Sequence, residues 1–210
     1  MSGRFISFEG GEGAGKTTNI TTAAGVLEQH DIPYIVTREP GGTDYAESIR
    51  EILLNKQREL LQDAAELLLV FAARIQHIEQ KIKPALAKGH WVLCDRFTDS
   101  SFAYQGYGRG ISLADIILLE ERFLGGFKPD KTILFDLPVE VGMARAKKRA
   151  TLDRFEDQHL DFFRKVRDGF LARAGQDSQR FVIVDAEQAL GSVSLQVEQA
   201  IRHLIAESCS

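Results

Sequence analysis

The chain has 210 residues, enough for one α/β domain with a substantial core and short for two, so we expect a single domain over residues 1–210. Hydrophobic residues make up 44% and charged residues 27%, the ordinary composition of a globular protein. The formal net charge of −4 argues against a nucleic-acid binder that depends on phosphate contacts.

The cysteines and the apolar runs indicate in which cellular compartment the protein is expected. Cys94 and Cys209 are the two cysteines, and neither metal-ligand spacing nor a disulfide framework follows from them. No apolar run approaches the about 18 residues that a membrane span needs. The N-terminus leads directly into an apolar run that predicts a strand, without a signal segment. We therefore expect a cytoplasmic protein with no membrane partner and no nucleic-acid partner.

Predicted strands and helices alternate along the chain. Short apolar runs predict strands over Phe5–Phe8, Tyr34–Val36, Trp91–Cys94, Lys131–Phe135 and Phe181–Val184. Apolar residues at three- and four-residue spacing predict helices over Thr18–His30, Tyr45–Leu54, Asp63–Lys88, Ser112–Phe123, Val139–Arg149, Phe155–Ala174 and Ser192–Ile205. Pro84 should break the longest of them. The alternation predicts an α/β fold, a parallel sheet of about five strands with helices on both faces.

Two stretches interrupt this alternation. Residues 98–110 mix three glycines with aromatic and polar residues, and residues 145–154 form a run much more basic than its surroundings. We expect both to pass over a ligand site. An exposed charged helix end is the alternative interpretation of the basic run.

The segment after the first predicted strand fits the phosphate-loop pattern G-x-x-x-x-G-K-[ST] without a mismatch. It consists of Gly10, Gly11, Glu12, Gly13, Ala14, Gly15, Lys16 and Thr17, followed by Thr18. A strand before the loop and a helix after it complete the setting. In such a loop backbone N–H groups point at phosphate oxygens, the lysine reaches the β- and γ-phosphates, and the threonine hydroxyl binds Mg²⁺. The loop therefore predicts a site for ATP or a similar triphosphate, with Mg²⁺.

Polar residues follow the other predicted strands where parallel sheets bind their ligands. Asp95 could hold the water shell of Mg²⁺ or orient an acceptor, and Arg96 could bridge two phosphate groups; a strand-end salt bridge is the structural alternative. Arg38 suits a second phosphate group, or it is a solvated residue of a tight connection. Phe71 and Arg74 are three apart on a predicted helix and share a face that could bind a base, although Phe71 alone suits core packing.

Other phosphate-loop classes fit less well. A GTPase needs D-x-x-G and N-K-x-D segments, and Asn55-Lys56-Gln57-Arg58 lacks the final aspartate. A motor or transporter ATPase usually ends a strand with Asp-Glu, whereas this chain has Asp95-Arg96. A small kinase with a basic lid remains, and such an enzyme must exclude water from the transferred phosphoryl group.

Four segments together resemble the bacterial type of thymidylate kinase, over almost the whole chain. They are Phe8-Glu9-Gly10 with Gly13-Ala14-Gly15-Lys16-Thr17-Thr18, then Thr37-Arg38-Glu39-Pro40-Gly41-Gly42-Thr43, then Asp95-Arg96-Phe97, then Ala103-Tyr104-Gln105-Gly106. The resemblance implies a phosphate-loop nucleoside monophosphate kinase fold, transfer of a phosphoryl group from ATP to dTMP, and a homodimer. A kinase for another nucleoside monophosphate and a regulatory module without turnover remain the alternatives.

The resemblance also implies residue roles. The loop from Gly10 to Thr18 would hold the ATP phosphates, Thr17 and Asp95 would serve Mg²⁺, and Lys16, Asp95 and Arg96 would act in catalysis. Residues implied to contact dTMP are Glu12 at the sugar 3′-hydroxyl, Arg38 and Arg96 at the phosphate, Arg74, Ser101 and Gln105 at the base edge, and Tyr104 at the sugar 2′ position.

Two positions differ among members of this family. Some members carry a catalytic arginine where this chain has Gly13, so the resemblance implies a lid arginine instead, Arg149 or Arg154, in a lid of about residues 143–155. Many members place the thymine-stacking phenylalanine four residues before the base-reading arginine. That position is Val70 here and Phe71 is three before Arg74, so either the helix is adjusted for Phe71 to stack or another side chain stacks.

Overall fold

The computed structural model describes residues 3–55, 59, 61–147 and 159–208. Its five strands form one sheet in the order β2-β3-β1-β4-β5, and all neighbouring strands are parallel. The strands are β1 (Phe5–Gly10), β2 (Tyr34–Arg38), β3 (Trp91–Asp95), β4 (Lys131–Asp136) and β5 (Phe181–Asp185). The predicted parallel α/β sheet is therefore confirmed.

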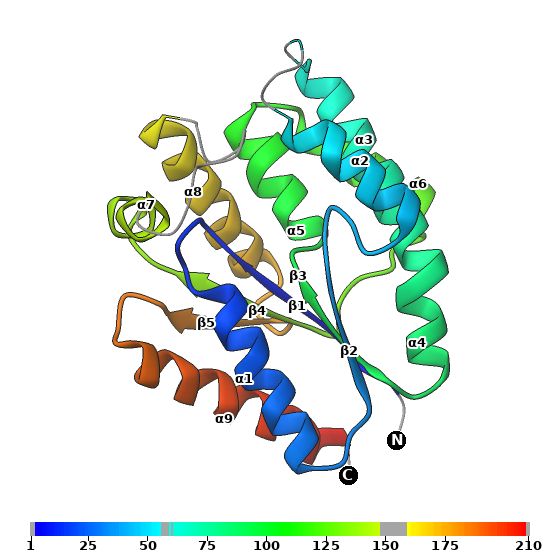
Figure 1. Ribbon diagram of the computed structural model, residues 1–210. Helices are drawn as coiled ribbons and strands as arrows, with labels where there is room; N and C mark the ends of the chain where they lie inside the picture. Colours follow the sequence, from blue (N-terminus) through cyan, green and yellow to red (C-terminus); the bar gives the residue numbers. More distant parts are fainter. Residues whose placement is uncertain (1–2, 56–58, 60, 148–158, 209–210) are drawn as a thin grey trace.

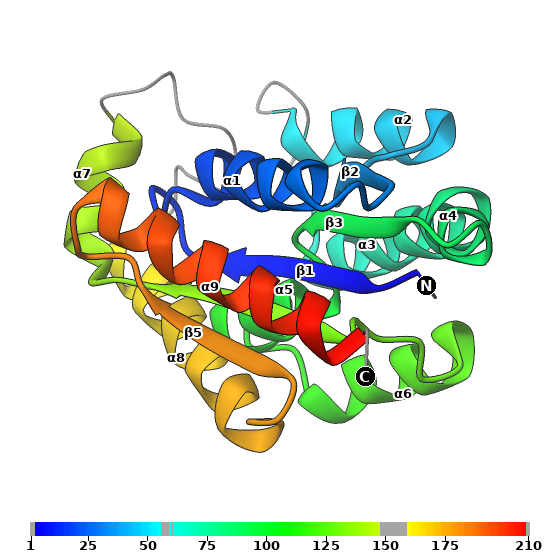
Figure 2. The same ribbon diagram turned by 90° about the horizontal axis from the view of Figure 1, so that it is seen from below.

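Helices cover both faces of the sheet (Figures 1 and 2). One face carries α1 (Lys16–Gln29) and α9 (Leu190–Ser208), which lie side by side in front of the sheet in Figure 2. The elements of the other face are α3 (Asp63–His77), η1 (Ile78–Ile82), α4 (Lys83–Ala87), α5 (Thr98–Ser101), η2 (Phe102–Gly108), α6 (Leu113–Leu124) and α8 (Leu160–Gln176). Helix α2 (Asp44–Leu54) packs on α3, and α7 (Val139–Lys147) follows β4.

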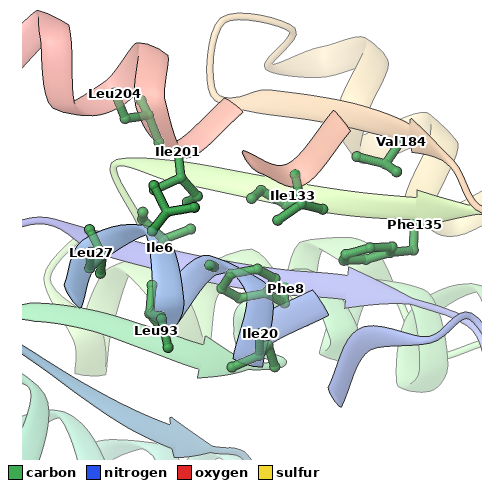
Figure 3. Packing of buried hydrophobic residues seen from close by; sticks show 14 of the residues in the cluster. Ile6, Phe8, Ile20, Leu27, Leu93, Ile133, Phe135, Val184, Ile201 and Leu204 are labelled. Atoms are coloured by element: carbon green, nitrogen blue, oxygen red, sulfur yellow. The ribbon is translucent and has the colours of Figure 1, made fainter. Parts of the chain in front are cut away.

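Strand alternation divides the core into clusters on the two faces. Successive side chains of a strand point to opposite faces, so Ile6 and Phe8 of β1 pack toward α1 and α9 while Phe5 packs on the other side. Figure 3 shows Ile20 and Leu27 of α1 and Ile201 and Leu204 of α9 meeting side chains of β1, β3, β4 and β5. The three central strands β1, β3 and β4 are thus buried on both faces, as their continuous apolar runs predict, whereas the edge strands expose Val36 and Ile183.

The longest predicted helix is interrupted close to Pro84. Helix α3 ends at His77, a π-helical segment η1 covers Ile78–Ile82, and α4 begins at Lys83 with Pro84 in its first turn. A proline has no N–H to donate and its ring clashes with the carbonyl four residues earlier, so the chain widens its turn just before it.

Most of the stretch 98–110, which was expected to pass over the ligand site, is helical, from Thr98 to Gly108. These residues form α5 and the π-helical segment η2, and η2 packs along α8. This packing buries Ser101, Tyr104 and Gln105 and fixes them on a rigid element. The lid predicted at about residues 143–155 is described only to Lys147, the end of α7, and Arg149 and Arg154 lie outside the described residues.

Within the described ranges, no helix is long and apolar enough to cross a membrane.

Replacement of Ile201 by alanine should lower the free energy of unfolding by about 2–5 kcal/mol, because Ile201 is fully buried between α9 and the sheet. Leu195 on the same helix is 54% exposed, and Leu195→Ala should change stability by about 0.5 kcal/mol or less. Urea unfolding of the two variants measures the difference. Equal losses would show that α9 does not pack as described.

Candidate functional site

A cavity of about 350 Å³ opens at the carboxyl ends of β1, β2 and β3. Strand register brings these ends together, because Arg38 pairs with Asp95 and Asp95 pairs with Phe8. The predicted site residues that line the cavity are Glu12, Gly13, Ala14, Gly15, Lys16, Thr17, Arg38, Arg74, Asp95, Arg96, Ser101, Tyr104 and Gln105. The structure therefore gathers segments far apart in sequence around one cavity.

Other predicted site residues lie away from this cavity. Gly10 and Gly11 line a smaller pocket behind the loop, and Thr18 is exposed on the first turn of α1. Phe71 is buried in the core beneath α3, where its ring lies 5.0 Å from the Arg74 guanidinium carbon. Val70, at the position that differs from many thymidylate kinases, lines the cavity instead.

Lys16 is held against its own loop. Its Nζ donates hydrogen bonds to the carbonyls of Gly10 and Gly11, at 3.0 and 3.1 Å. Burial and the nearby Arg96 guanidinium lower the pKa of Lys16 below its usual value. The ammonium group is thus fixed at the mouth of β1, where a phosphate on the loop N–H groups would meet it.

Arg96 joins the loop to the neighbouring helix. Its Nη1 donates to the Gly10 carbonyl at 3.1 Å and its Nη2 to Glu12 Oε1 at 2.7 Å, and its guanidinium carbon lies 4.9 Å from the centre of the Tyr104 ring. The backbone of Arg96 has a φ of 70°, a left-handed conformation that costs a non-glycine residue of the order of 1 kcal/mol or more. In this backbone conformation the side chain reaches the loop, where its hydrogen bonds to Gly10 and Glu12 are made.

Glu12 and Tyr104 are joined by a hydrogen bond in the cavity wall. The Tyr104 hydroxyl donates to Glu12 Oε1 at 2.7 Å, the same oxygen that accepts from Arg96. Burial and the Glu12 carboxylate raise the pKa of Tyr104 well above its usual value, so the phenol keeps its proton. The fixed Tyr104 ring and the fixed Glu12 carboxylate can thus discriminate between ligands by shape and by hydrogen bonding.

Glu9 accepts hydrogen bonds from the residues at the start of α5. Its two carboxylate oxygens accept from the Phe97 backbone N–H at 2.7 Å and from the Ser100 hydroxyl at 2.6 Å. Burial, and then the neighbouring Asp99 carboxylate, raise the pKa of Glu9 to about 7. These bonds fix the turn that carries Arg96 relative to β1.

Arg74 is fixed from three sides. It donates from Nε to Glu39 Oε2 at 2.6 Å, from Nη1 to Ser101 Oγ at 2.9 Å and from Nη2 to the Phe97 carbonyl at 3.1 Å. His77, fully buried, donates from Nδ1 to the other Glu39 oxygen at 3.0 Å. A guanidinium has five N–H donors, so two of them remain after these three bonds.

Asp95 and Thr17 fit a magnesium site. Asp95 Oδ1 is buried without a hydrogen-bond partner among the described residues, and both side chains line the cavity beside Lys16. The described residues contain no cluster of three or more histidine, cysteine or acidic ligands. One carboxylate beside a threonine hydroxyl suits Mg²⁺, which usually binds through one or two carboxylates together with substrate phosphates and water.

Several residues of the cavity wall were not predicted from the sequence. Arg50 of α2 lines the cavity and donates from Nη1 to the Pro40 carbonyl at 2.9 Å. An arginine in an amphipathic helix usually faces solvent, so its sequence position carried no signal. Glu39 and Pro40 also line the cavity. They belong to the segment Thr37–Thr43 that carries the family resemblance, so this segment was a signal for them. The others are Leu54, Ser100 and Ala146.

Gly13 lies against α7 and leaves no room for a side chain. A Cβ built on Gly13 would come within 2.0 Å of the Gly142 carbonyl oxygen, and one built on Gly142 would come within 2.4 Å of the Glu12 carbonyl oxygen. Gly13 also has a φ of 70°. The backbones of the loop and of α7 therefore touch directly, and an arginine at position 13 would displace α7.

Replacement of Gly13 by alanine should lower both the unfolding free energy and the affinity for ATP by moving α7 off the loop. Gly175→Ala on the exposed side of α8 is the matched control, because a Cβ there meets nothing within 4 Å and Gly175 lies outside the predicted ATP site. Thermal unfolding and ATP titration of both variants test the contact. Full stability and full affinity of Gly13→Ala would show that the loop and α7 are not in contact.

The chain matches a family model described as thymidylate kinase over residues 8–197. A protein from Alcanivorax borkumensis named thymidylate kinase is 56% identical over 204 residues, which cover 97% of this chain and 98% of that protein. A thymidylate kinase from Pseudomonas fluorescens is 53% identical with 98% of each chain covered, and one from Pseudomonas putida is 52% identical with 100% of this chain and 99% of that protein covered. The chain belongs to the thymidylate kinase family.

Proposed function

We propose that this chain transfers the γ-phosphoryl group of ATP to dTMP, giving dTDP and ADP. One observation carries the proposal: a single cavity is lined both by a phosphate loop with Lys16 and Arg96 and by the polar pair Arg74 and Gln105. Membership of the thymidylate kinase family supports the same reaction. The cavity is thus suited to bind a nucleoside triphosphate and a nucleoside monophosphate together.

Catalysis would depend on positioning and on charge neutralisation. The acceptor phosphate is already an anion, so the reaction needs no strong general base. Lys16 and Arg96 are anchored to one carbonyl, that of Gly10, and would place two positive charges beside the transferred group without reorganisation. Mg²⁺, held by Thr17 and Asp95, would neutralise phosphate charge when bound.

The acceptor would lie along the wall formed by α2, α3 and η2. Arg38, held by Glu47 at 2.8 Å, would bind the dTMP phosphate together with Arg96, and Arg50 is a third cation on that side. Glu12 and Tyr104 would contact the sugar, with the Tyr104 ring crowding the 2′ position. Arg74, Ser101 and Gln105 would read the base edge. The apolar contact with thymine would come from Val70, which lines the cavity, and not from Phe71, which is buried in the core.

The lid and the assembly complete the proposal. Arg149 or Arg154 would supply the lid arginine; both lie outside the described residues.

We propose that the protein is cytoplasmic and forms a homodimer. The dimer is supported by exposed apolar side chains on the adjoining helices α3 and α6, where Leu68 is 58%, Leu118 61% and Phe123 58% exposed. An equilibrium sedimentation experiment measures the assembly.

A panel of acceptors tests the proposed reaction. ADP release should be measured with ATP and Mg²⁺ and one of dTMP, dUMP, UMP, CMP, AMP or GMP, and without an acceptor. We expect rapid turnover with dTMP, weaker turnover with dUMP and little with the others. Preference for another monophosphate would reassign the base-reading residues, and ATP binding without turnover would favour a regulatory module.

Lys16→Ala should lower kcat by about a hundredfold or more, because the ammonium group would stabilise charge that develops in the transition state. Lys83→Ala is the control, since Lys83 is a surface residue paired with Glu79. The same ADP-release assay gives both values. A kcat of Lys16→Ala close to that of the unchanged protein would refute the assigned role.

A further inference from the structure

A buried carboxylate lies behind the part of the cavity wall that is proposed to read the base, which is formed by Arg74, Ser101 and Gln105. Glu66 of α3 is fully buried, and its Oε1 accepts a hydrogen bond from Gln105 Nε2 at 2.9 Å. Arg109 supplies the countercharge, with its Nη2 3.4 Å from Glu66 Oε2. Glu66 does not line the cavity, whereas Gln105 does.

Helix α3 places Glu66 in line with the cavity wall. Glu66, Val70 and Arg74 follow one another at four-residue spacing, so they share one face of the helix. Val70 and Arg74 line the cavity, and Glu66 lies one turn farther along the same face. The hydrogen bond from Arg74 to Ser101, four residues before Gln105, brings Arg74 close to the turn that carries Gln105.

The carboxylate determines which end of the Gln105 amide faces the cavity. An ionised carboxylate only accepts hydrogen bonds, so Gln105 must present its NH₂ group to Glu66. Its carbonyl oxygen is then the end left for the cavity, and it has no hydrogen-bond partner among the described residues. Arg74 offers only donors, two of which remain after its bonds to Glu39, Ser101 and Phe97.

We infer that Glu66 is a positioning residue that determines base selectivity by fixing the amide orientation of Gln105. The wall then presents an N–H donor from Arg74 beside a carbonyl acceptor from Gln105. Such a wall pairs with a base edge that carries a carbonyl oxygen beside a ring N–H, as thymine and uracil do, and it opposes cytosine, whose edge carries an amino group beside a bare ring nitrogen. This inference rests on the proposed function.

The isosteric variant Glu66→Gln tests the orientation. A glutamine at position 66 both donates and accepts, so the Gln105 amide is free to turn over and offer its NH₂ group to the ring nitrogen of cytosine. We expect the ratio of kcat/KM for dTMP to that for dCMP to fall by at least about tenfold. The ratio of dTMP to dUMP should not change, because the two bases share this edge, and the KM for ATP should also stay constant.

Two comparison variants separate positioning from general damage. Glu79→Gln removes a surface carboxylate of η1 and should leave every ratio unchanged. In a Gln105→Met background, Glu66→Gln should have no further effect on selectivity, since the two changes act through one amide. A further loss of dTMP over dCMP selectivity in that background would overturn the inference.

The outcomes distinguish this inference from the proposed function. If the unchanged protein does not phosphorylate dTMP, the proposed function fails. If it does and Glu66→Gln folds with an unchanged dTMP to dCMP ratio, the inference fails alone. Should Glu66→Gln not fold, Glu66→Asp keeps the negative charge near Arg109 and withdraws the carboxylate from Gln105; the same fall in selectivity is expected, and an unchanged ratio overturns the inference.

Discussion

The site depends on two cations that share one backbone carbonyl. Lys16 Nζ and Arg96 Nη1 both donate to the Gly10 oxygen, at 3.0 and 3.1 Å. Gly10 ends β1, Lys16 begins α1 and Arg96 follows β3, so three elements of the sheet meet at this oxygen. Two like charges repel in a buried position unless anions accompany them. Glu12 provides one such anion here, and bound phosphates would provide more.

Buried carboxylates hold the working side chains in place around this point. Glu9 fixes the turn after Arg96, Glu39 fixes Arg74, and Glu66 fixes Gln105, each with no more than 4% of its surface exposed. Burying a charge costs several kcal/mol unless its hydrogen bonds are made. Each of these carboxylates therefore tolerates only a narrow range of partner positions, and the cavity wall is set before a substrate enters.

Much of this arrangement was predictable from the sequence, and the exceptions have physical causes. The strands and the loop were found because buried parallel strands are continuous apolar runs and because the loop has fixed spacing. The helical form of residues 98–110 was missed, since packing on α8 outweighs the glycines there. The position of Arg50 in the cavity wall and the hydrogen bonds of Glu39 and Glu66 depend on contacts between segments far apart in the sequence. A local sequence pattern does not encode such contacts. The burial of Phe71 depends on which side of α3 faces the core.

We propose that Lys16 and Arg96 stabilise transfer of the γ-phosphoryl group to a nucleotide acceptor and not to water. The most direct measurement follows labelled γ-phosphate in a single turnover of ATP with dTMP, and determines labelled dTDP and labelled inorganic phosphate in the same samples. We expect the label to appear in dTDP, and little labelled inorganic phosphate to form either with or without dTMP. Label that appears mainly as inorganic phosphate at a rate independent of dTMP would contradict this proposal.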